Sequence, residues 1–79
     1  MITAGQCRAA RAFLKWTLPD LAQVSMVSIS TINAFELGHR HPIRANLAAI
    51  ARAFEGAGIE LVDDNGVRLK SAPRAGSAS

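Results

Sequence analysis

Apolar residues recur at helical spacing through most of this 79-residue chain. In the first segment Cys7 and Leu14 share one apolar stripe, which predicts a helix over about residues 4–15. Thr3 and Gln6 have the spacing at which a hydroxyl and an amide satisfy free backbone N–H groups at a helix start. We therefore expect this helix to begin directly after Thr3.

Two shorter helices are predicted next. Thr17 is placed to cap a helix over about residues 18–24. Ser28 is placed to cap a third helix over about residues 29–37, with Gly38 as its C-terminal stop. The pattern therefore predicts two short helices joined by a tight turn.

A fourth helix is predicted from an i, i+3, i+4, i+7 stripe, and it should close at Gly56 or Gly58. That stripe consists of Leu47, Ile50, Ala51 and Phe54. We expect Trp16 to fill the space between the first and second helices. Four helices then account for residues 1–58.

Residues 59–70 change character and alternate apolar and polar side chains around an Asp-Asp-Asn-Gly stretch, which favours a β-hairpin. A two-residue Asn-Gly loop would place Leu61 opposite Lys70, whereas a type I turn with a bulge at Gly66 places it opposite Leu69. We prefer the second register because it gathers four apolar residues on one face: Ile59, Leu61, Val67 and Leu69. A lone hairpin is barely stable, so it must dock on the helices or on a second subunit.

The expected fold is therefore mainly α. A compact four-helix domain over residues 1–58 precedes a docking or dimerising hairpin over residues 59–70 and a disordered tail over residues 71–79. A chain of 79 residues buries only about 60% of its unfolded surface, so dimerisation would add stability. We expect Ile59, Leu61 and Val62 to pair across the two-fold axis.

Charge and composition narrow the function classes. Nine basic against six acidic residues give a net charge of +3, and residues 1–58 carry the whole excess, which weakly favours a polyanionic partner. A single cysteine, Cys7, excludes an intramolecular disulfide and a cysteine-based zinc site, and His39 and His41 have no third ligand placed by the sequence. We expect no cofactor or metal. No leader and no apolar run of roughly 18 residues is present, so we expect a soluble, cytoplasmic protein.

The segment from Trp16 to Pro42 reads W-T-x-x-x-L-A-x-x-x-x-V-S-x-x-T-I-x-x-F-E-x-G-x-R-x-P. This pattern closely resembles the lambda-repressor-like (XRE, or Cro/repressor) helix-turn-helix family over about residues 3–58, and the short bacterial members look closest. The resemblance implies sequence-specific binding of double-stranded DNA by a dimer, transcriptional regulation, expected to be repression, and a third helix in the major groove.

The resemblance also implies roles for single residues. Thr17, Ser28 and Thr31 would contact phosphates, and His39, Arg40 and Arg44 would supply charge beside the groove. Four residues of the third helix would face the bases: Ile29, Ser30, Asn33 and Ala34. Asn33 can bond adenine bidentately, Ser30 can pair with several bases, and the two apolar residues can meet a thymine methyl group.

Each of these roles has a competing interpretation. Ile29 and Ala34 are equally well explained as exposed helix residues or as part of a protein interface, and Ser28 is an N-cap in any case. Glu36 is interpreted as structural, in a pair with a nearby arginine. A rival function is that of an antitoxin or accessory subunit that binds a protein partner through this fold. An enzyme is disfavoured because the chain has no carboxylate pair, glycine-rich phosphate loop or placed nucleophile.

Two residues depart from the family pattern. Met26 and Lys15 stand where glycine is usual. Either the backbone stays left-handed there, at a cost on the order of 1 kcal/mol for each residue, or the turn is reshaped.

Overall fold

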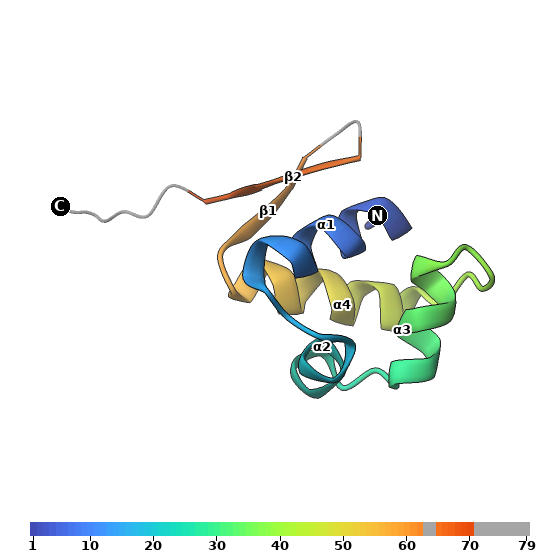
Figure 1. Cartoon of the computed structure of the whole chain (residues 1–79). Helices are drawn as coiled ribbons and strands as arrows, with labels where there is room; N and C mark the ends of the chain where they lie inside the picture. The colour runs from blue at the N-terminus through green and yellow to red at the C-terminus, as the bar shows by residue number, and fades with distance from the viewer. Residues whose placement is uncertain (63–64, 71–79) are drawn as a thin grey trace, which may run out of the picture.

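Four helices come first along the chain and two strands follow (Figure 1). The computed structural model describes residues 1–62 and 65–70, so the predicted tail over residues 71–79 lies outside the described residues. The elements are α1 (Ala4–Leu14), α2 (Leu18–Ser25), α3 (Ile29–Glu36), α4 (Arg44–Gly56), β1 (Ile59–Val62) and β2 (Gly66–Leu69). The predicted mainly α fold with a C-terminal hairpin is confirmed.

Side-chain caps set the starts of the first three helices, as the sequence predicts. The Thr3 hydroxyl accepts from the Gln6 N–H at 3.1 Å while the Gln6 side chain accepts from the Thr3 N–H at 3.0 Å. Thr17 and Asp20 form the same reciprocal pair at the start of α2. α4 differs, since its N-cap residue is Ile43 and no side chain bonds to the backbone there.

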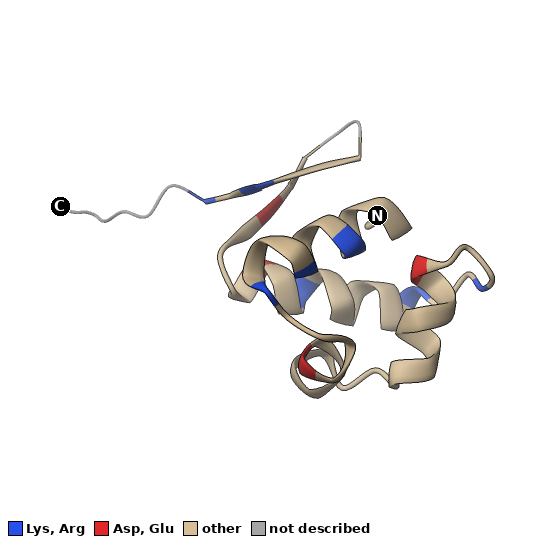
Figure 2. Ribbon diagram, viewed as in Figure 1, with Lys and Arg blue, Asp and Glu red and all other residues tan. Residues whose placement is uncertain are grey.

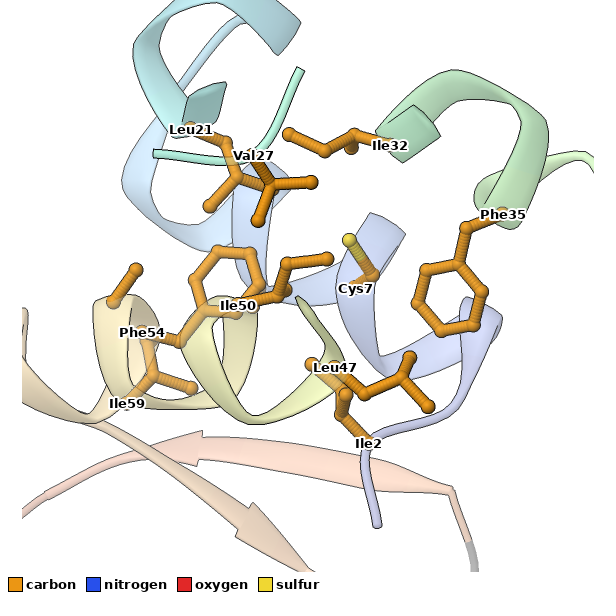
Figure 3. Close-up of a cluster of buried hydrophobic side chains, with 12 residues drawn as sticks. Ile2, Cys7, Leu21, Val27, Ile32, Phe35, Leu47, Ile50, Phe54 and Ile59 are labelled. Atoms are coloured by element: carbon orange, nitrogen blue, oxygen red, sulfur yellow. The ribbon is translucent and has the colours of Figure 1, made fainter. Parts of the chain in front are cut away.

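The core lies where α1, α2, α3 and α4 meet, and it also takes side chains from the chain start and from β1 (Figure 3). Its largest fully buried side chains include Phe54, Leu21 and Ile32. Trp16 is partly buried and stacks on Phe54 with ring centroids 5.8 Å apart. The core residues are Ile2, Cys7, Ala10, Leu21, Val27, Ile32, Phe35, Leu47, Ile50, Ala53, Phe54 and Ile59.

The two positions that lack the usual glycine keep a left-handed backbone, so of the two alternatives the reshaped turn does not form. Lys15 has φ 57° and Met26 has φ 63°. At these angles the Trp16 N–H bonds to the Arg11 carbonyl at 2.9 Å and the Met26 N–H to the Ala22 carbonyl at 2.8 Å. These C-cap bonds satisfy carbonyls that the helix ends leave free, which offsets the strain of an L-residue there.

The hairpin register differs from both predicted registers. Leu61 lies opposite Val67 and Val62 opposite Gly66, rather than Leu61 opposite Leu69 or Lys70. Asn65, with φ 68°, takes the left-handed position that the prediction gave to glycine. The observed register differs from the preferred one by two residues. Since side chains alternate between the two faces of a strand, a shift of two keeps the same four apolar side chains on one face.

The hairpin docks on the helices of its own chain. Ile59 is fully buried, and Leu61 and Val67 pack against the core. The Gln6 side-chain amide donates to the Val62 and Gly66 carbonyls at 2.8 and 3.0 Å, which ties the turn end of the hairpin to α1. The hairpin and α2 lie on opposite sides of the pair formed by α1 and α4 (Figure 1).

Candidate nucleic-acid interface

α3 has a buried face and an outer face, and the two carry different chemistry. Ile32, Phe35 and Glu36 are at most 5% exposed and face the helices behind. The outer face begins with Ile29, which is 45% exposed, and continues through exposed Ser30 and Asn33. Since residues three and four apart share one side of a helix, these side chains form one stripe open to a ligand.

Glu36 is the charged residue of α3, and internal bonds turn it away from the outer face. The Arg11 guanidinium donates two hydrogen bonds to its carboxylate, each of 2.7 Å, and the Cys7 thiol donates a third at 3.1 Å. Burial alone would raise the pKa of Glu36, but these hydrogen bonds and the charge of Arg11 outweigh it and hold the pKa below its usual value. Arg8 also donates to the Glu36 backbone carbonyl.

The same contacts decide the state of Cys7. Burial, together with the carboxylate of Glu36, raises the pKa of the Cys7 thiol far above its usual value. The thiol is therefore a hydrogen-bond donor in the core, which agrees with its place on the apolar stripe predicted for the first helix.

The starts of the helices differ in how many free N–H groups they offer to an anion. At the start of α2 the side chain of Asp20 adds a negative charge. The backbone N–H of Asp20 already donates to the Thr17 hydroxyl, and Pro19 has no N–H to offer. The first turns of α3 and α4 contain no acidic residue. Since anions bind at helix starts with free N–H groups and no negative side chain, α3 and α4 are better phosphate sites than α2.

Hydroxyl groups at the start of α3 are partly used within the chain. The Ser28 hydroxyl accepts from the Thr31 N–H at 3.2 Å and donates to the Thr31 hydroxyl at 2.8 Å. Ser28 is thus an N-cap, as predicted, and the Thr31 hydroxyl keeps its own proton for a further acceptor.

Besides Arg8 and Arg11 of α1, which bond to Glu36, cations lie on the segment that follows α3. Figure 2 shows no Lys or Arg on α2 or α3, and blue positions on the loop after α3 and at the start of α4. These are Arg40 and Arg44, both exposed, and His39 precedes them. The sequence analysis also placed the positive charge after the third helix rather than on it.

Eight of the ten residues predicted to contact DNA are exposed, and Thr31 and Ala34 are half-buried. The structure brings most of them together along α3 and the segment after it. The exposed eight are Thr17, Ser28, Ile29, Ser30, Asn33, His39, Arg40 and Arg44.

Sequence reasoning missed one residue of the outer face. Leu37 directly follows α3, lies four residues after Asn33 and is 59% exposed. Its place four residues after Asn33, on the stripe of Ile29 and Asn33, is the signal that could have marked it as a surface residue.

The predicted dimer residues are placed unequally. Ile59 is fully buried in its own chain, whereas Leu61 and Val62 are half-buried. The outer face of the hairpin carries an ion pair of Glu60 and Arg68, with 2.9 Å between carboxylate oxygen and guanidinium nitrogen. A partner would therefore meet Leu61 and Val62 rather than the side chain of Ile59.

Among residues 1–62 and 65–70, no group of three or more His, Cys, Asp or Glu side chains could hold a metal ion. Within the same described part of the chain, no helix is both long and apolar enough to cross a membrane.

A family model described as helix-turn-helix matches residues 8–60, which is most of the chain. None of the curated proteins compared with the chain matches it.

Proposed function

Because this chain belongs to the lambda-repressor-like helix-turn-helix family, we propose that it is a sequence-specific, double-stranded DNA-binding transcriptional regulator that acts as a dimeric repressor in the cytoplasm. The family is one of DNA-binding regulators and not of enzymes. In this proposal α3 lies in the major groove and its outer face reads the bases.

The observation that carries the proposal is the polar outer face of α3, followed along the chain by the uncapped N-terminus of α4. Ser30 and Asn33 present exposed hydrogen-bonding groups from a rigid helix. In the next helix, α4, no side chain caps the start, so the N–H groups of Arg44 and Ala45 are available, and Arg44 is an exposed cation in the first turn. A phosphate bound there would hold α3 at a fixed depth in the groove.

The proposed dimer follows from the small size of the chain and from the strand edges of the hairpin. A two-stranded sheet has two edges with unpaired backbone groups, and Leu61 and Val62 are half-buried beside one of them. Two copies would place two α3 helices on successive turns of DNA. Sedimentation at tens of micromolar, an order-of-magnitude range for weak dimers, should show a dimer that Leu61→Asp disrupts; a monomer there would contradict this part.

Fluorescence anisotropy tests DNA binding directly. A duplex from the region upstream of this protein's own gene is compared with a scrambled duplex at two salt concentrations. We expect preference for the first duplex to survive the higher salt, and Asn33→Ala to weaken binding to it about 5- to 150-fold, the range for one lost bidentate base contact. Gln23→Ala, an exposed amide of α2, is the control and should leave binding unchanged. Equal binding to both duplexes that disappears with salt would indicate only a basic surface.

A second candidate function is binding of a protein partner, as in an antitoxin or accessory subunit. The observation that favours it is the outer face of α3, which has no charge and exposes Ile29 and Leu37. Apolar residues open to solvent in one stripe are typical of helix-in-groove interfaces. Co-purification of a stable complex with a non-self protein, together with no affinity for duplex DNA, would favour this function over the first.

A further inference from the structure

The exposed stripe of α3 extends about one turn beyond the residues predicted to contact bases and includes Leu37. Ile29, Asn33 and Leu37 follow one another at intervals of four residues, with exposed fractions of 45% for Ile29 and 59% for Leu37. Four residues of helix correspond to about 6 Å of rise. Asn33 therefore has an apolar residue about one helical turn away along the axis on each side, Ile29 before it and Leu37 after it.

No charge remains on this stripe. Glu36 is 5% exposed and held by Arg11, and α2 and α3 contain no Lys or Arg. Guanine is most often read by bidentate Arg or Lys, and cytosine by a carboxylate that accepts from its amino group. The outer stripe therefore lacks the side chains that select G·C pairs.

The side chains that are present fit the other base pair. Asn bonds adenine bidentately, and apolar side chains contact the methyl group of thymine. We propose that this protein reads A·T-rich half-sites, in which Asn33 bonds an adenine while Ile29 and Leu37 contact thymine methyl groups on either side. This inference rests on the proposed function and names the class of DNA sequence that it selects.

The spacing limits where the thymines lie. Successive base pairs are about 3.4 Å apart along the duplex, so a separation of about 6 Å covers two base steps. Both thymines should therefore lie within two base pairs of the adenine that Asn33 bonds, on either strand.

Selection by the full chain from a pool of random 20-base-pair duplexes identifies the preferred sites. The enriched sites should contain an A·T pair flanked by A·T pairs at those positions. The same selection with Asn33→Ala shows which positions lose their base preference. Enrichment of G·C pairs at those positions by the unaltered chain would overturn the inference.

The second step replaces thymine by uracil in the selected duplex, which removes the methyl group and keeps base pairing and charge. Loss of one buried methyl contact should raise Kd about fourfold, and loss of two about fifteenfold. Leu37→Ala should reduce the ratio of uracil to thymine Kd to about fourfold. Leu69→Ala is the matched control, because Leu69 is also exposed, at 55%, but lies on β2, away from α3 (Figure 1).

The outcomes separate this inference from the proposed function. Equal Kd for thymine and uracil duplexes, or an equal ratio in Leu37→Ala and the unaltered chain, would overturn the reading of methyl groups and leave DNA binding standing. Failure to retain any duplex in the selection would contradict the proposed function itself, and the inference with it.

Discussion

Removal of the Arg11 side chain tests how strongly Glu36 depends on its partner. Two 2.7 Å hydrogen bonds join the pair, and the side chains of Arg11 and Glu36 are 22% and 5% exposed. Breaking a buried pair from one side costs about 3–5 kcal/mol, because the remaining charge stays buried. Arg11 is partly exposed and the Cys7 thiol still donates, so we expect Arg11→Ala to cost about 3 kcal/mol at pH 7. That is a large part of the roughly 4–12 kcal/mol expected for a chain of 79 residues.

The pH dependence should change sign in this variant. In the unaltered chain the pKa of Glu36 is lowered, so its contribution is present above the unfolded pKa and is lost as pH falls through the folded pKa. Without Arg11, burial dominates and raises the pKa of the carboxyl above its unfolded value. In the variant the contribution of Glu36 should therefore be most favourable below about pH 4, near the unfolded pKa, and be lost as pH rises through the higher folded pKa.

Urea unfolding followed through Trp16 fluorescence at several pH values between 4 and 7 measures both effects, because this single tryptophan stacks on Phe54 in the core. The loss relative to the unaltered chain should shrink toward pH 4. Arg11→Ala combined with Glu36→Gln should recover part of the stability at pH 7, since no charge is then buried. A loss below about 1 kcal/mol, the range of an exposed pair, or one that is constant with pH would refute this reasoning.

Three further predictions address the turns, the hairpin and the DNA-facing charge. Lys15→Gly and Met26→Gly should each raise the free energy of unfolding by about 0.5–1 kcal/mol, because glycine adopts the left-handed backbone without strain; a loss of stability in urea would contradict this. Gln6→Ala should lower the midpoint of thermal unfolding and cost about 2 kcal/mol, since two carbonyls of the hairpin and one cap lose their donor or acceptor; an unchanged midpoint would count against that anchor. Removing either Arg40 or Arg44 should reduce the slope of log Kd against log salt by about 0.9 for each phosphate contact, measured by anisotropy, whereas an unchanged slope would place that residue away from phosphates.

The features that could be predicted from the sequence are those decided over a few residues. Thr3, Thr17 and Ser28 each cap a helix that begins at the next residue, because a hydroxyl reaches only backbone groups two or three positions on. The core-facing side of α3 also followed from local pattern, since Ile32 and Phe35 have the spacing of a buried face, whereas its outer residues came from the family resemblance.

The features that were missed depend on contacts between distant parts of the chain. The hairpin register was wrong because two adjacent residues, Asn65 and Gly66, both tolerate a left-handed backbone, and local sequence does not decide between them. The structure places Asn65 there, and the Gln6 amide then bonds both the Val62 and the Gly66 carbonyls. The turn sequence alone does not determine the hairpin register, and Gln6, about sixty residues earlier in the chain, stabilises the register that is observed.

The sequence indicated that Glu36 pairs with an arginine but not with which one. That the partner is Arg11 has a functional consequence. Arg11 is held by the Glu36 carboxylate and Arg8 by its backbone carbonyl, so α1 has little free charge to offer near α3. The positive charge near the groove is then left to Arg40 and Arg44, which follow the reading helix instead of lying on it. Such a division lets phosphate contacts set the affinity and its salt dependence, while uncharged side chains on α3 discriminate between bases.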